Sequence, residues 1–206
     1  MLLDKDIREP LFNFLEEKYG KVRILEEKVI GKSRADVLMV CEDGLCGLEI
    51  KSDSDNYSRL KTQVKDYDSF YDRNYAVVGT SHALHISEHI PDTWGIIVVE
   101  KVDDKLDFYL QREAQINPNK DLKKELSLLW RRELVHIQEI NNLPAYAQKS
   151  KAFVREKILE KVDHDLLLKQ ICQELFERDY TTIKEDIDNY RRSKGRRARR
   201  KIPKRR

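Results

Sequence analysis

The sequence contains no long hydrophobic run, and this absence limits the kinds of protein that it can encode. A membrane-spanning helix needs about 20 consecutive apolar residues, and no stretch of the chain approaches that length. Residues 1–10 carry mixed charge, where a signal peptide would have an apolar core. We therefore predict a cytoplasmic protein with no membrane partner.

Cysteine is also scarce, with three residues in a chain of 206. Cys41 and Cys46 are close in sequence, Cys172 is far from both, and no second Cys or His pair stands at the spacing of a zinc site. We expect reduced and mostly buried thiols, as is usual in the cytoplasm.

The C-terminal segment 191–206 lacks acidic residues altogether. It contains 11 of the 40 lysines and arginines, which leaves 29 basic and 37 acidic residues, a net charge of −8, in the rest of the chain. Like charges repel and such a segment has little apolar surface to bury, so we predict a disordered basic tail. Its charge suits the phosphates of a nucleic acid, with a solubilising or targeting role as the alternative. The arginines expected to make such contacts include Arg196, Arg197, Arg199 and Arg200.

Apolar residues make up 40% of the chain, enough to bury a core. Apolar and polar residues alternate with a period of two at 22–30, 34–41 and 45–51, which predicts three strands. Short apolar runs at 75–79 and 94–100 are typical of central strands in a parallel or mixed sheet. Residues 106–110 fit a last edge strand.

Helical periodicity occurs around these strands. Residues 11–19 and 55–73 each place apolar side chains on one face. The start of the first helix stays open, because Pro10 suits a first turn but disfavours helical geometry at Glu9. After Pro118 the strand pattern stops, and further helices are expected at 122–137, 154–162, 167–175 and 182–190.

These patterns predict an α/β fold in which a mixed sheet is flanked by helices. We divide the chain into a core at 1–117, a helical extension at 118–190 and the basic tail at 191–206.

The hairpin between the second and third strands determines which charged side chains meet. If Asp43 and Gly44 form a two-residue loop, Asp36 lies opposite Lys51. Side chains alternate along a strand and opposite residues project from the same face, so Asp36, Glu49 and Lys51 should converge. The other face of this hairpin is apolar and is expected to face the main core.

A third carboxylate is a candidate for the same face. Any even-numbered loop around Gly31 places Glu27 on the face of Asp36. Glu27 is then either part of the site or a solvated strand residue.

Two carboxylates beside a lysine suit metal-assisted hydrolysis of a phosphodiester. Oxygen ligands hold Mg²⁺ or Mn²⁺, and the ion lowers the pKa of a bound water and polarises a phosphoryl oxygen. The lysine can orient that water or offset charge that develops at phosphorus. The alternative is an ordinary solvent-facing sheet with an ion pair between Asp36 and Lys51.

Several short motifs follow one another along the chain in a characteristic order. They are Arg34-Ala35-Asp36, then Glu49-Ile50-Lys51-Ser52, then Arg59, Leu60 and Gln63, then Trp94-Gly95-Ile96, and finally Leu129-Trp130-Arg131. In this order they resemble the restriction-endonuclease-like, or PD-(D/E)XK, nuclease superfamily, and within it a poorly characterised bacterial and phage family. The proline of the superfamily name is replaced by Ala35.

The resemblance implies roles for individual residues. Asp36 and Glu49 would be the metal ligands, joined by the backbone carbonyl of Ile50, and Lys51 would be the catalytic lysine. Gln63 matches a position that faces the active site in relatives, and Tyr67, one helical turn later, would share that side. An acid on the first helix assists in related resolvases, and Glu9 is the candidate for it here.

We therefore predict a metal-dependent phosphodiesterase, in the first place a DNA nuclease of repair or defence, with DNA favoured over RNA. The alternative is a nuclease-fold protein that binds nucleic acid or acts as an adaptor, with weak or absent catalysis. The helical region could also form a homodimer or bind a protein partner.

Overall fold

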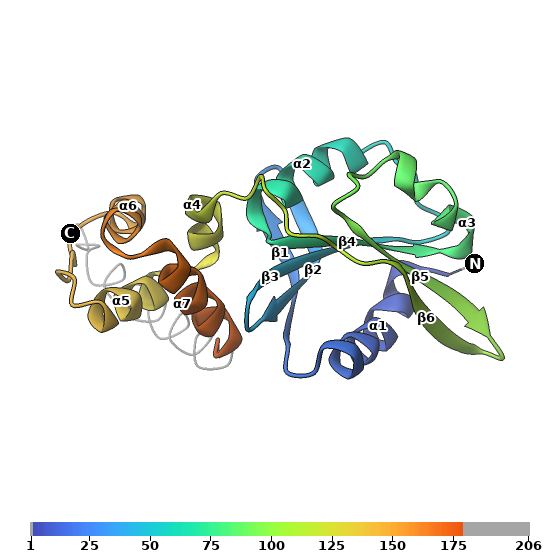
Figure 1. Cartoon of the computed structure of the whole chain (residues 1–206), viewed down its shortest axis with the longest axis horizontal. Helices are drawn as coiled ribbons and strands as arrows, with labels where there is room; N and C mark the ends of the chain where they lie inside the picture. Colours follow the sequence, from blue (N-terminus) through green and yellow to red (C-terminus); the bar gives the residue numbers. More distant parts are fainter. Residues whose placement is uncertain (1, 179–206) are drawn as a thin grey trace, which may run out of the picture. The chain divides into compact units, whose positions relative to one another are not determined.

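The computed structural model describes residues 2–178, and within them six strands form one mixed sheet (Figure 1). The strands lie in the sheet in their order along the chain. The first three pair antiparallel, the third, fourth and fifth pair parallel, and the sixth returns antiparallel at the edge. This confirms the predicted α/β class with buried central strands. The strands are β1 (Arg23–Ile30), β2 (Ser33–Cys41), β3 (Gly44–Lys51), β4 (Arg73–Gly79), β5 (Gly95–Val102) and β6 (Lys105–Arg112).

Helices flank this sheet and continue after it. They are α1 (Asp4–Tyr19), α2 (Leu60–Phe70), α3 (Thr80–Ala83), η1 (Ile86–Glu88), α4 (Leu122–Glu125), η2 (Leu126–Leu128), α5 (Arg131–Ile140), α6 (Lys151–Lys161) and α7 (His164–Phe176). The predicted helices at 154–162 and 167–175 match α6 and α7. The predicted helix at 182–190 and the basic tail lie outside the described residues. Within residues 2–178, no helix is long and apolar enough to cross a membrane.

Helix α1 begins at Asp4, well before the predicted residue 11, and contains Pro10 in its interior. Ile7, Leu11 and Leu15 form its fully buried stripe. A proline inside a helix costs about 3 kcal/mol, whereas each buried Leu or Ile contributes roughly 1.5–3 kcal/mol. Burial of the stripe against the sheet therefore outweighs the cost of the proline.

Two further helix predictions differ from the structure. Helix α2 is shorter than the predicted 55–73. The single helix expected at 122–137 is wrong, because the backbone is extended at Leu129 and Trp130, with ψ of 148° and 168°. The Trp130 N–H then donates to the Glu133 carboxylate at 2.6 Å, which satisfies one of the free donors at the start of α5.

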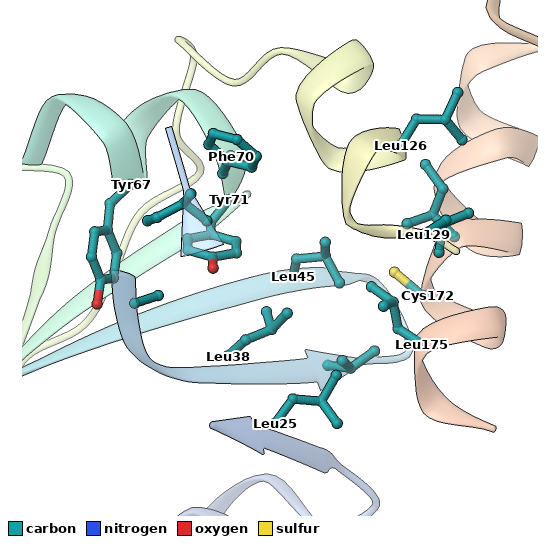
Figure 2. Close-up of a cluster of buried hydrophobic side chains, with 14 of the residues drawn as sticks. Leu25, Leu38, Leu45, Tyr67, Phe70, Tyr71, Leu126, Leu129, Cys172 and Leu175 are labelled. Carbon is teal, nitrogen blue, oxygen red and sulfur yellow. The ribbon is translucent and has the colours of Figure 1, made fainter. Parts of the chain in front are cut away.

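Both faces of the sheet carry a buried cluster. On one face, α1 packs on Val37, Met39 and Leu48. That face of the β2–β3 hairpin was expected to meet the main core, but it meets the smaller cluster. The larger cluster lies on the opposite face with Leu38 and Leu45, and α2 and the helices that follow β6 cover it. Figure 2 shows this cluster, with Tyr67, Phe70 and Tyr71 at one end and Leu126, Leu129, Cys172 and Leu175 at the other.

The chain divides into two units, Met1–Phe176 and Glu177–Arg206. The first unit contains both the sheet and helices α4 to α7. The larger cluster joins residues of the predicted core and of the predicted helical extension, so these two parts share buried surface.

Candidate active site

The register of the β2–β3 hairpin differs from the predicted one by two residues. Cys41 pairs with Gly44 and Val37 with Leu48, so the tight loop consists of Glu42 and Asp43. Gly44 is therefore the first residue of β3, with φ of 154°, and a Cβ there would lie 2.7 Å from an oxygen of Asp72. Only glycine fits so close to that side chain.

A shift of two residues keeps every side chain on its face, because the period of a strand is two. Continuing the observed register places Asp36 across from Glu49. The predicted convergence of Asp36, Glu49 and Lys51 therefore does not depend on the loop that was predicted wrongly.

The three side chains lie together at the end of β3. Lys51 Nζ is 2.6 Å from Glu49 Oε1, and both side chains are almost completely buried. Asp36 Oδ2 accepts a hydrogen bond of 2.9 Å from the backbone N–H of Ile50, the residue between them. The site thus joins two neighbouring strands through one backbone contact.

Helix α2 supports the Glu49 carboxylate from above the sheet. Gln63 donates to Glu49 Oε1 and accepts a hydrogen bond of 3.1 Å from Lys51 Nζ. The Tyr67 hydroxyl donates to Glu49 Oε2 at 2.8 Å and accepts from the backbone N–H of Asp36 at 3.1 Å. Both side chains therefore face the site, as the resemblance implied.

Tyr67 reaches the strands because β3 carries a glycine below it. A Cβ at Gly47 would lie 2.7 Å from the Tyr67 ring and 2.3 Å from the Tyr71 ring. Tyr67 is fully buried. Burial first, and then the charges of Glu49 and Asp36, raise the pKa of Tyr67 well above its usual value, so its hydroxyl remains a donor.

Burial and the nearby charge of Glu49 raise the pKa of Asp36 to about 7. A cation bound between two carboxylates that are this close would offset the repulsion between their charges. Within residues 2–178, no group of three or more His, Cys, Asp or Glu side chains could hold a metal. The donors are thus two carboxylates and a neighbouring backbone, a set that fits Mg²⁺, which is often held by one or two carboxylates and several waters.

Asp36, Glu49 and Lys51 line a cavity of about 710 Å³. Its walls come from α1, the β1–β2 hairpin, the end of β3 and the start of α2. Acidic and basic side chains are equally frequent in the wall, which suits a cation and a phosphate side by side. The charged residues that line it are Asp4, Arg8, Glu27, Lys32, Arg34, Asp36, Glu49, Lys51, Asp55 and Arg59.

Glu27 lines this cavity, as strand parity predicted. The β1–β2 loop is the two-residue Gly31-Lys32 turn, because Ile30 pairs with Ser33. The Glu27 carboxylate lies 2.8 Å from Arg8 Nη2 and 2.6 Å from Arg34 Nε. It is therefore held by two arginines in this structure.

Sequence reasoning missed Asp4 and Arg8, which are four residues apart on α1 and line the cavity. It named Glu9 as the acid of the first helix, but Glu9 is exposed and does not line the cavity. The predicted helix began at residue 11, so it did not include Asp4 and Arg8. Their i, i+4 spacing places them on one face of α1. The tail residues Arg196, Arg197, Arg199 and Arg200 lie outside the described residues.

Residues 2–201 match the family described as bacteriophage P4 protein cII. The chain belongs to this family. A search of curated proteins finds no match. Among solved structures, Pyrococcus furiosus SfsA in complex with Ca²⁺ is similar at 14% sequence identity, with a TM-score of 0.34. The alignment covers 54% of this chain and 62% of SfsA.

Membership of the cII family covers the whole candidate site, because the matched region includes every residue that lines the cavity. It does not assign a reaction.

Proposed function

We propose that this protein is a metal-dependent phosphodiesterase of the restriction-endonuclease-like class that hydrolyses nucleic acid, with DNA as the favoured substrate. One observation carries the proposal: two carboxylates and a lysine from adjacent strands, Asp36, Glu49 and Lys51, lie together on the wall of one cavity. This combination of acidic oxygens and a buried cation serves both a divalent ion and a phosphate.

Asp36 and Glu49, with the carbonyl of Ile50, would hold Mg²⁺ or Mn²⁺. When bound, such an ion activates water and polarises a phosphoryl oxygen. Lys51 lies 2.6 Å from Glu49 and can donate to a phosphoryl oxygen or to the attacking water. Gln63 contacts both of these side chains, so it keeps the lysine and the carboxylate at a fixed separation.

The cations of the cavity wall support a polyanionic substrate. Lys32, Arg34 and Arg59 lie at the β1–β2 hairpin and at the start of α2, and all three line the cavity. Phosphate contacts supply much of the affinity of proteins for nucleic acids. A strand whose scissile phosphate sits beside Lys51 would place its neighbouring phosphates within reach of such side chains.

Nuclease assays test the proposal directly. Purified protein is incubated with single-stranded, duplex and branched DNA and with RNA, in Mg²⁺, in Mn²⁺ and in EDTA. We expect cleavage that needs the metal and falls at least ~100-fold in Asp36→Ala, which loses a metal ligand, and in Lys51→Ala, which loses the cation beside the reacting phosphate. The measurement is the initial rate on a labelled substrate.

Matched controls are Asp107→Ala and Lys61→Ala, which remove the same charges at exposed positions outside the cavity. These controls should cleave at the rate of the unaltered protein. Cleavage that persists unchanged in both Asp36→Ala and Lys51→Ala would contradict the assignment.

A second candidate function is binding of nucleic acid without efficient catalysis. The observation that favours it is that both carboxylate oxygens of Glu49 already accept hydrogen bonds. Lys51 and Gln63 donate to one oxygen, and Tyr67 donates to the other. If these contacts exclude the ion, the protein binds oligonucleotides in EDTA and Mg²⁺ alike and cleaves none of them. Fluorescence anisotropy run beside the nuclease assay separates the two functions.

A further inference from the structure

Arg8 on α1 lies within a ring of carboxylates beside the proposed metal ligands. Its Nε is 2.8 Å from Asp4 Oδ2, its Nη1 is 3.1 Å from Glu26 Oε2, and its Nη2 is 2.8 Å from Glu27 Oε1. These partners come from α1 and β1. The Arg8 side chain is 16% exposed, so most of its guanidinium surface is withdrawn from solvent.

The same guanidinium reaches the proposed metal ligand Asp36 on β2. Arg8 Nη1 donates to the backbone carbonyl of Asp36 at 3.3 Å, and Nη2 lies 3.7 Å from its Oδ1. The other oxygen of Asp36 accepts from the N–H of Ile50. Asp36 is therefore held from α1 on one side and from β3 on the other.

Backbone strain next to this ring indicates that its geometry is maintained against a local preference. Glu27 has φ of 55°, although it lies inside β1 between two residues that pair regularly with β2. A residue other than glycine adopts this backbone conformation only when the surrounding contacts hold it there. Here Arg8 and Arg34 both hold the Glu27 carboxylate.

The charges of this ring are incompletely balanced without Arg8. Four carboxylates lie within 4 Å of its guanidinium, those of Asp4, Glu26, Glu27 and Asp36. Within residues 2–178 no three acidic side chains are placed to hold a metal ion, so the guanidinium neutralises these carboxylates. A guanidinium has five donors in a fixed fork, so one arginine can bind several carboxylates and a carbonyl at once.

We propose that Arg8 is a positioning residue that fixes Asp36 and neutralises the acidic ring around it, so that the site binds a single divalent ion. This inference rests on the proposed function. Arg8 would act through Asp36 and the acidic ring, and Asp36 and Glu49 would hold the single ion. Helix α1 thereby becomes part of the site through one side chain.

Counting bound ions on the full chain, without nucleic acid, tests the inference. Isothermal titration calorimetry with Mn²⁺, supported by electron paramagnetic resonance of the free ion, should give one site for the unaltered protein. In Arg8→Met, Asp36 loses its contact with α1. We therefore expect the ion to bind about 10- to 100-fold more weakly, the usual effect of removing a group that orients a ligand.

The matched control is Arg73→Met, which removes an arginine that lies 2.9 Å from Asp43 and does not line the cavity. It should keep one site of nearly unchanged affinity. Two sites in the unaltered protein, or one site of unchanged affinity in Arg8→Met, would overturn the inference.

If Arg8→Met does not fold, as judged by circular dichroism, Arg8→Lys gives the answer. Lysine keeps the charge but cannot form the fork, so we expect one ion with at least a several-fold loss of affinity. Unchanged affinity in Arg8→Lys would overturn the positioning role. Failure of the unaltered protein to bind any ion would instead contradict the proposed metal-dependent function, and the two failures are therefore distinguishable.

Discussion

At the scale of single residues, Asp36 is the most informative position. It is the side chain on which the sheet, α1 and the Glu49 carboxylate all act, through Ile50, Arg8 and electrostatic repulsion. Burial and repulsion raise its pKa to about 7, so in the absence of a metal the folded protein retains a proton that the unfolded chain has lost.

This shift makes a prediction about stability. Because the folded pKa is the higher one, the free energy of unfolding of the metal-free protein should fall as the pH rises from about 4 through 7. Asp36→Asn keeps an acceptor for Ile50 but cannot ionise. We expect it to be more stable than the unaltered protein at pH 8, by on the order of 2 kcal/mol, and to differ much less at pH 5.

Urea unfolding in EDTA at the two pH values measures this difference, with Asp107→Asn as the exposed control. Excess Mg²⁺ should narrow the gap at pH 8, because the ion binds the ionised native site. A difference between the two proteins that is the same at both pH values would contradict the prediction.

At the scale of elements, α4 is joined to the sheet through a buried acidic pair. Glu125 on α4 is fully buried near Asp72, and Lys120 contacts both carboxylates. Asp72 also accepts from the N–H of Leu45 at 2.7 Å, at the start of β3. The pair thus links the helices that follow the sheet to a central strand.

Burial first, and then the charge of Asp72, raise the pKa of Glu125 to about 9. Ionisation of Glu125 therefore opposes folding, and stability should be lost as the pH rises from about 4.5 through 9. Glu125→Gln should lose less of its Tm between pH 6 and pH 9 than the unaltered protein does, by roughly 4–8 °C for ~2 kcal/mol.

Thermal melts followed by circular dichroism test this, with Glu156→Gln on α6 as a control whose carboxylate is 60% exposed. Equal losses of Tm in Glu125→Gln and in the unaltered protein would show that Glu125 does not titrate in this range, and would contradict the prediction.

At the scale of the whole molecule, charge is divided between an acidic body and a basic tail. Residues 191–206 carry 11 positive charges and no negative ones, in a chain whose overall net charge is +3. Each phosphate contact that releases a counterion steepens the salt dependence of binding to duplex DNA by roughly one unit of log–log slope. The tail is therefore expected to dominate affinity for nucleic acid.

We predict that deletion of residues 191–206 weakens duplex binding at low salt and lowers the slope of log K against log salt by several units. Fluorescence anisotropy at a series of salt concentrations in EDTA measures both. A tail of the same composition in scrambled order should restore binding, since the contacts are electrostatic. A slope that deletion leaves unchanged would exclude the tail as the main contact.

The sequence alone determined the sheet and the composition of its central site. Alternation in β2 and β3 placed Asp36, Glu49 and Lys51 on one face, and it did so despite a register that was wrong by two, because strand parity is local. It also determined that Gln63 and Tyr67 share one side of a helix. The roles of these residues in catalysis stay predictions.

Only the tertiary structure decided what surrounds the site. The start of α1 depends on burial of Ile7 against the sheet, which outweighs the local effect of Pro10, and this brings Asp4 and Arg8 to the cavity. The break between α4 and α5 also depends on contacts that a periodicity cannot contain. Patterns along the chain record which side a residue faces, whereas the partner on that side comes from segments distant in sequence.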